Sequence, residues 1–286
     1  MPVGYDSTPS GFAARWWCVD KAAVTRRTVL VGGAGVAAGV WLLPDGPGGL
    51  WPRFTGGPDP VVPAEPAGDE RVERRWSAAR GREVDFYTAV PEGHGDGRGL
   101  PVCLVLHGGS KVPRDFPSLG LGRFLTAAVD LGAPPLVLAG ATGDRLAWRP
   151  SGDDDPQAMV HEEIPAWCAG RGFDVGRMAV WGWSMGGAGA LRLAEAFPGF
   201  VRSVAAFSPA VRPGDDVFAG LRALDGVPVG LWCGREDDLY DEVRALHRAL
   251  PAEPVAGGYT AGGRHNFGYW SRVIPAAFAF LASTLQ

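Results

Sequence analysis

The stretch RMAVWGWSMGGAGALRLAEAF, residues 177–197, decides the fold. Its apolar run over 178–181 has the length of a buried strand, and apolar residues from Met185 onward recur at helical spacing. Between them, Ser184 is the centre of a GxSxG pattern, GWSMG. A nucleophilic serine at a sharp strand-to-helix turn needs such glycines, because a larger residue would collide with neighbouring backbone. The alternative is an ordinary turn whose serine caps the helix.

The composition indicates an ordinary globular protein and excludes several function classes. Hydrophobic residues make up 46% and charged residues 20% of the 286 residues, and the net charge is −4. No basic run exists on the scale that phosphate backbones require, so we expect no nucleic-acid partner. The four cysteines show neither a CxxC pair nor the spacing of a metal site, so we expect no metal and no cofactor.

The N-terminal segment, residues 1–43, has the layout of an export signal or anchor. Arg26 and Arg27 precede an apolar, glycine-rich run over 29–43. That run is shorter than the ~20 residues that span a bilayer comfortably. The paired arginines resemble a twin-arginine signal, so we expect an extracytoplasmic protein, either secreted or tethered to the membrane through residues 26–43. A GxGxxG-like pattern at Gly33 follows the arginines instead of a strand, and the dinucleotide interpretation is rejected.

The chain organisation predicts one catalytic domain behind a linker. Residues 44–68 are too rich in Pro and Gly to pack, and we place the folded domain at 69–286. An alternating pair of segments over 71–77 and 82–90 predicts two antiparallel strands. Short apolar runs then alternate with patterns of helical length; the runs cover 102–106, 136–139, 178–181, 201–207 and 227–232. This alternation predicts an α/β fold with a mostly parallel sheet and helices on both faces.

Histidine is the base that a serine nucleophile needs, and two histidines follow Ser184 in the chain. His247 lies in an amphipathic helical pattern, where a solvated surface role is expected. His265 lies in the glycine-rich stretch GGYTAGGRHNFGYW. In enzymes whose nucleophilic serine lies at such a strand-to-helix turn, the chain order is nucleophile, acid, histidine. We therefore predict His265 as the base.

The acid and the oxyanion donors are predicted from two further strand ends. The stretch GREDDLYDE follows a strand and offers Asp237 and Asp238, one of which would orient the histidine. The stretch LVLHGGS ends another strand, and its Gly108 or Gly109, together with Met185, would supply backbone N–H donors to the oxyanion. His107, in the same stretch, is expected to be structural.

In chain order the four stretches are LVLHGGS, GWSMG, GREDDLYDE and GGRHNFGYW, and in this order and spacing they resemble the α/β-hydrolase fold. Within it they are similar to the esterase branch that includes S-formylglutathione hydrolase (esterase D) and the secreted mycolyltransferases. The resemblance runs from about Arg71 to Leu281. In that branch the acid usually stands three residues after a glycine at the strand end, which implies Asp237, after Gly234. Arg264, directly before the histidine, departs from the branch and places a charge that could affect acidic substrates.

The predicted activity is hydrolysis of small-molecule or cell-envelope carboxylic esters through an acyl-enzyme. Ser184 attacks, His265 transfers the proton and Asp237 orients His265. One alternative is an acyltransferase of the mycolyltransferase type, with a sugar or another alcohol as acceptor. An alternative of another class is a non-catalytic wall-binding protein that keeps the fold.

The substrate pocket is expected to be shallow and to favour short acyl chains. Only about 20 residues separate the strand ending near Phe207 from the next, which allows one short helix and no cap domain. Aromatic side chains are expected to line the pocket: Trp148, Trp183 and Tyr269. The segment 142–157 would form one wall, with an acidic rim over 153–155.

Overall fold

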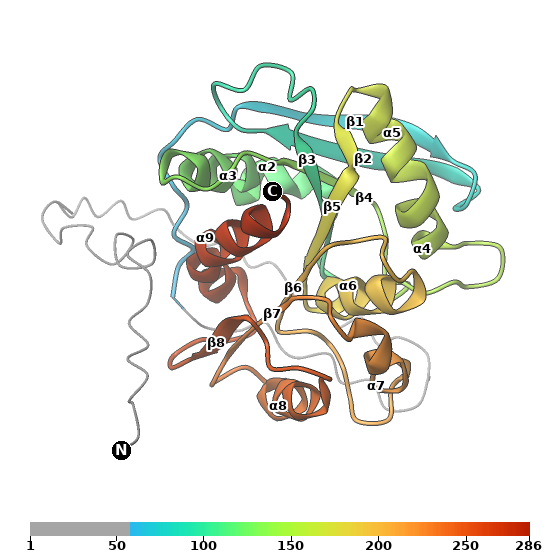
Figure 1. The fold of residues 1–286 in the computed structure, drawn as a ribbon, viewed down its shortest axis with the longest axis vertical. Helices are drawn as coiled ribbons and strands as arrows, with labels where there is room; N and C mark the ends of the chain where they lie inside the picture. The colour runs from blue at the N-terminus through green and yellow to red at the C-terminus, as the bar shows by residue number, and fades with distance from the viewer. Residues whose placement is uncertain (1–57) are drawn as a thin grey trace, which may run out of the picture. The chain divides into compact units, whose positions relative to one another are not determined.

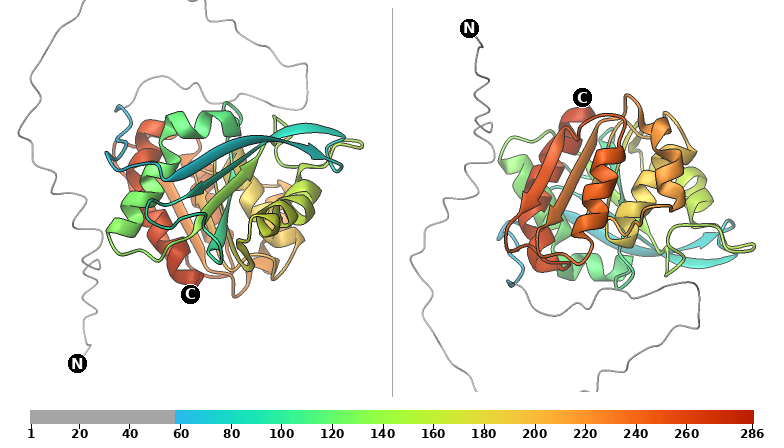
Figure 2. Two further views of the ribbon diagram at one scale, coloured as in Figure 1. Left: turned by 90° about the horizontal axis from the view of Figure 1, so that it is seen from above. Right: turned by 90° about the horizontal axis from the view of Figure 1, so that it is seen from below.

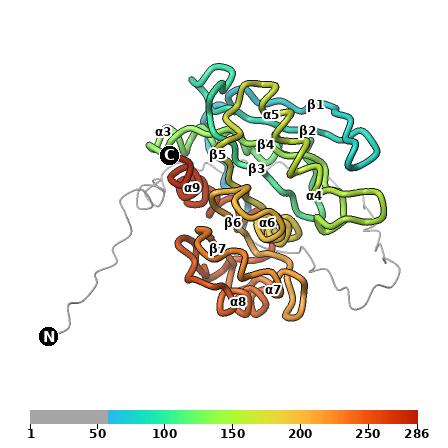
Figure 3. Tube along the Cα trace, turned by 45° about the vertical axis from the view of Figure 1, so that its right-hand side comes forward, coloured from blue at the N-terminus to red at the C-terminus, as the bar shows by residue number. Residues whose placement is uncertain are grey.

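The computed structural model describes residues 58–286, and these form an eight-stranded sheet in the order β1-β2-β4-β3-β5-β6-β7-β8. The strands are β1 (Asp69–Ser77), β2 (Arg82–Val90), β3 (Pro101–Leu106), β4 (Val137–Ala141), β5 (Asp174–Trp183), β6 (Val204–Phe207), β7 (Val229–Gly234) and β8 (Ala256–Thr260). β1 pairs antiparallel with β2, and β2 pairs antiparallel with β4. All other neighbours are parallel. The predicted α/β class and the opening antiparallel pair are thereby confirmed, and Figure 3 follows the trace from β1 at one edge through β5 to β7.

Helices cover both faces of the sheet. They are α2 (Phe116–Leu119), α3 (Leu121–Asp130), α4 (Pro156–Ala158), α5 (Ile164–Gly170), α6 (Met185–Ala196), α7 (Asp216–Gly220), α8 (Tyr240–Ala249) and α9 (Phe267–Thr284). Figure 1 shows α3 and α9 together on one side, and α5 and α6 on the other; Figure 2 gives the same division from above and below. Right-handed crossovers between parallel strands place helices in this way.

Apolar runs became strands because both of their faces are covered. Every residue of β3, β4, β6 and β7 is buried. On the α9 side, Trp181 packs edge-on against Phe207 and Phe278, with ring centroids 5.5 and 5.2 Å apart. This dense core holds the carboxyl ends of β3, β5 and β7 in one fixed arrangement.

No cap domain covers the sheet in the part of the chain that the structure describes. Between the end of β6 at Phe207 and the start of β7 at Val229, the chain forms α7 and one 3-10 turn over Leu221–Leu224. The expected single short helix is confirmed. No helix among residues 58–286 is both long and apolar enough to cross a bilayer.

The linker expected over 44–68 is corrected in its last part, because residues 58–68 pack on the domain. The Val61 N–H donates to Ser271 Oγ of α9 at 3.0 Å, and Arg123 Nε of α3 donates to Glu65 O at 3.1 Å. Pro63 is buried. Proline-rich chain can pack in extended form when helix side chains supply its hydrogen bonds. The export segment 1–43 and the rest of the linker lie outside the described residues, so the export signal stays a prediction.

Candidate active site

Ser184 occupies a strained turn between β5 and α6. Its backbone angles are φ 54° and ψ −120°, and residues other than glycine rarely adopt a positive φ. The Ser184 N–H donates to Phe207 O at 2.8 Å, and Ser184 O accepts the Ala210 N–H at 2.9 Å. A Cβ on Gly182 would overlap Gly186 O, and one on Gly186 would overlap Leu106 O. The glycines of the GxSxG pattern therefore let β3, the turn and α6 approach backbone to backbone.

His265 lies within hydrogen-bond distance of this serine. Its Nε2 is 2.8 Å from Ser184 Oγ, although the two residues are far apart in the chain. The Asn266 side chain accepts the Tyr269 N–H at 3.0 Å and begins α9, which fixes the loop just after His265. Trp270 packs edge-on against the imidazole at 5.1 Å, and its Nε1 donates to Ser208 Oγ at 3.2 Å.

Asp237, and not Asp238, faces the histidine. The two Asp237 carboxylate oxygens lie 2.9 and 3.0 Å from His265 Nδ1. The Asp237 side chain is fully buried and also accepts the Leu239 N–H at 2.9 Å, whereas Asp238 is exposed. A buried carboxylate on Nδ1 favours the tautomer whose Nε2 can accept the serine proton.

Backbone N–H groups near the serine belong to two elements that pack on each other, α6 and the chain after β3. Met185 is the first residue of α6, so its N–H has no acceptor within the helix. Gly108 and Gly109 follow β3, and among residues 58–286 their N–H groups donate no hydrogen bond. Gly108 lies against the Trp183 side chain, which leaves no room for a Cβ. The three N–H groups are thus available to a developing oxyanion.

His107 directly precedes these glycines, and its ring contacts the chain after β3 and the chain after β4; the side chain is buried and neutral. The Gly143 N–H donates to His107 Nε2 at 2.9 Å, so the proton is on Nδ1, which lies 2.9 Å from Gly108 O. Burial lowers the pKa of His107 to about 4, and the hydrogen bond to Gly108 opposes this shift. His107 is therefore a fixed link between the loops after β3 and β4, in keeping with the expected structural role.

The three aromatic residues expected to line a pocket lie in the core, and that expectation was wrong. Trp148, Trp183 and Tyr269 are each no more than 2% exposed. Trp148 packs against Gly189 of α6, and its Nε1 donates to His107 O at 3.1 Å. Residue type alone does not tell whether a large ring faces a cleft or the core.

The expected acidic rim over 153–155 is largely neutralised. Asp155 caps α4 by accepting the N–H groups of Gln157 and Ala158, each at 2.9 Å. Asp154 pairs with Arg80 and Arg82. Of the three acids only Asp153 is exposed, and within the described part of the chain it makes no such contact. Arg80 leaves no signal in the local sequence, because its partners lie more than 60 residues away in the chain.

His247 and Arg264, the two further titratable residues that the sequence singled out, lie at the surface. His247 is on α8, where it contacts Tyr259 Oη and Glu253 Oε2, each at 2.7 Å, and it has the expected surface role. Arg264 Nε is 3.4 Å from Glu236 Oε2, and both side chains are about half exposed, so its charge is shared with a neighbour. Among residues 58–286, no three His, Cys, Asp or Glu side chains cluster to hold a metal ion.

Comparisons with known proteins now identify the family. The esterase family model, described as "Putative esterase", matches residues 77–253. The chain belongs to this esterase family. The matched residues include Ser184 and Asp237, and His265 lies beyond them. Membership and the esterase neighbours support carboxylic ester hydrolysis as the activity.

Solved structures agree on the fold. A ferulic acid esterase has a TM-score of 0.65 at 16% identity, covering 76% of this chain and 98% of its own. The S-formylglutathione hydrolase from Agrobacterium tumefaciens has a TM-score of 0.61 at 18% identity, covering 76% and 95%. MPT51 (FbpC1) from Mycobacterium tuberculosis has a TM-score of 0.59 at 15% identity, covering 77% and 100%. No curated protein sequence matches the chain significantly. These likenesses confirm the α/β-hydrolase fold, and the family match places the chain in its esterase branch.

Proposed function

We propose that this esterase works through a serine nucleophile and an acyl-enzyme. The observation that carries the proposal is the continuous line of hydrogen-bond distances from Ser184 Oγ through His265 to Asp237, at 2.8 and 2.9 Å. These side chains come from three separate strand ends and meet at a strained turn. Strain and burial at one point are typical of sites that a reaction requires.

The proposed chemistry has two half-reactions. Ser184 Oγ attacks the ester carbonyl carbon while His265 Nε2 takes its proton, and the N–H groups of Met185 and of Gly108 or Gly109 stabilise the oxyanion. The ester C–O bond then breaks, and His265 returns the proton to the departing alcohol. Water next attacks the acyl-enzyme, His265 again takes and returns a proton, and the carboxylic acid leaves. Asp237 stays ionised and stabilises the imidazolium.

Covalent labelling by a fluorophosphonate, together with turnover of para-nitrophenyl acetate, tests this assignment. Ser184→Ala should remove labelling and lower turnover by on the order of 10⁴, and His265→Ala should do nearly the same. Asp237→Asn should cost far more than Asp238→Asn, which is the matched control at an exposed neighbour. Substantial turnover by the folded Ser184→Ala protein would refute the serine mechanism.

We further propose a preference for short acyl chains. The single short helix α7 between β6 and β7 leaves no cap that could bury a long chain. Each methylene removed from water contributes about 0.8 kcal/mol, and an open site removes few of them. Acetyl to butyryl nitrophenyl esters should therefore be turned over more efficiently than decanoyl esters. A catalytic efficiency that climbs steadily with chain length would instead favour an acyltransferase that binds long chains on its surface.

A further inference from the structure

An open pocket of about 420 Å³ lies beside the glycine loop of the candidate active site. Its walls are residues 109–112 and Asp115, from the chain after β3, and residues 144–145, from the chain after β4. Gly109, one of the proposed oxyanion donors, forms part of the wall. A group bound in this pocket would therefore lie beside a proposed oxyanion donor. The volume is in the range of pockets for small ligands.

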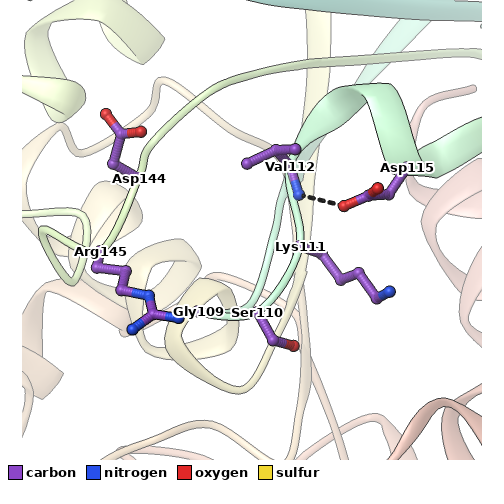
Figure 4. A pocket seen from close by; sticks show the side chains of 7 residues that line it. All are labelled: Gly109, Ser110, Lys111, Val112, Asp115, Asp144 and Arg145. Atoms are coloured by element: carbon purple, nitrogen blue, oxygen red, sulfur yellow. Dashed lines mark hydrogen bonds between the residues drawn. The ribbon is translucent and has the colours of Figure 1, made fainter. Parts of the chain in front are cut away.

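Two cationic side chains of this pocket, Lys111 and Arg145, have no acidic partner among residues 58–286. Among residues 58–286, no carboxylate lies within 4.0 Å of Lys111 or Arg145. Figure 4 shows the Arg145 guanidinium reaching toward Gly109 and Ser110, while the Asp144 carboxylate points away from it. Both cations are thus available to a ligand.

The two acids of the pocket do not cancel these cations. Asp144 is paired with Arg80 and Arg82, at 2.8 and 2.6 Å, and neither arginine lines the pocket. Asp115 accepts the Val112 N–H at 3.0 Å in the wall of the pocket. Two positive side chains against one negative leave a net positive pocket.

We infer that this pocket selects esters that carry a carboxylate, with Arg145 and Lys111 as specificity-determining residues. A guanidinium binds a carboxylate through two parallel N–H bonds, and an ammonium adds a strong point charge. The two cations lie on different segments of the pocket wall, Lys111 after β3 and Arg145 after β4, and together they make the wall positive. The inference rests on the proposed function, because it names the substrate class of the same site.

Matched ester pairs test the inference on both halves of the substrate. Phenyl butyrate is compared with 3-carboxyphenyl butyrate for the alcohol half, and para-nitrophenyl hexanoate with the para-nitrophenyl monoester of adipate for the acyl half. The readout is the ratio of kcat/KM for the anionic ester to that for the neutral ester, after subtraction of spontaneous hydrolysis. The wild-type ratio should exceed one in at least one pair and should fall with added salt.

Charge variants then assign the effect to the pocket. Arg145→Gln and Lys111→Gln should each lower the ratio about fivefold, mainly through KM, and Arg145→Glu should lower it further. Arg98→Gln is the control, because it removes one exposed arginine charge before β3, away from the candidate site. Its ratio should match the wild type. Circular dichroism melting of each variant checks that the fold is kept.

Two failures can be told apart. If the wild type hydrolyses neutral esters but neither anionic ester is favoured, or if the Arg145 and Lys111 variants keep the wild-type ratio, the inference is overturned and the proposed function stands. If the wild type hydrolyses no ester and takes no fluorophosphonate, the proposed function is overturned, and the inference with it.

Discussion

Two loops next to the candidate site are held by opposite means. The turn over 182–186 contains no charge and is fixed by backbone packed against backbone, with β3 on one side and the chain after β6 on the other. The loop after β4 is fixed by charge, since Arg80 donates to Thr142 O and pairs with Asp144 and Asp154. The first arrangement tolerates no added atom. The second depends on the ion pairs that Arg80 makes with Asp144 and Asp154.

This difference explains why one loop could be predicted and the other could not. Close backbone packing requires glycine, and glycine is visible in the sequence, so the pattern of residues alone places the turn at Ser184. An ion pair between Arg80 and Asp154 leaves no local pattern, because the fold decides which arginine reaches which aspartate. The sequence therefore predicted an acidic rim over 153–155, although two of its three carboxylates have partners in the folded protein.

The largest expected effect comes from adding one methyl group to the turn. Gly186→Ala should lower the free energy of unfolding by at least about 3 kcal/mol and abolish ester turnover, because its Cβ would overlap Leu106 O and neither backbone segment can move. Urea unfolding and turnover measure both effects. Gly170→Ala at the end of α5 is the control, because its Cβ meets nothing within 4 Å, and it should change stability by less than about 1 kcal/mol. Equal stability of the two variants would contradict the close-packing account.

The remaining sequence predictions were correct where a feature leaves a local pattern in the sequence and wrong where it depends on tertiary packing. Apolar runs predicted the strands because burial on both faces leaves a local pattern, and chain order singled out His265. The choice of Asp237 over Asp238 depends on which of two adjacent side chains turns inward, and the spacing typical of the family indicated the correct one. Trp148, Trp183 and Tyr269 were misplaced because the face on which a ring lies depends on tertiary packing. Lys111 and Arg145 were missed since an unpaired charge is defined only by the absence of neighbours in space.

The next effect tests the charged loop with two arginines that share the same two acids. Arg80 is fully buried, whereas the Arg82 side chain is 45% exposed, and both pair with Asp144 and Asp154. Arg80→Gln should lower the free energy of unfolding by about 2 kcal/mol, because carboxylates and a carbonyl lose a buried partner. Arg82→Gln should cost less than about 1 kcal/mol, as exposed pairs do. Equal losses in urea unfolding would mean that burial does not decide the strength of these pairs.

The smallest effect at neutral pH, and one that grows in acid, concerns His107, which joins the loops after β3 and β4. His107 is neutral in the folded protein, with a pKa lowered by burial to about 4 from the ordinary 6.5. Between these values the unfolded chain binds a proton that the folded protein does not, so stability falls as the pH drops through this window. Between pH 7 and pH 5 this contribution amounts to about 2 kcal/mol. His107→Gln removes the titrating group, so the variant should lose less stability than the wild type over that interval. Turnover should also drop at pH 7, since Gly108 and Gly143 lose their common partner. If wild type and variant lose stability in parallel between pH 7 and pH 5, burial does not hold His107 in its neutral form, and the account of this link between the loops after β3 and β4 is wrong.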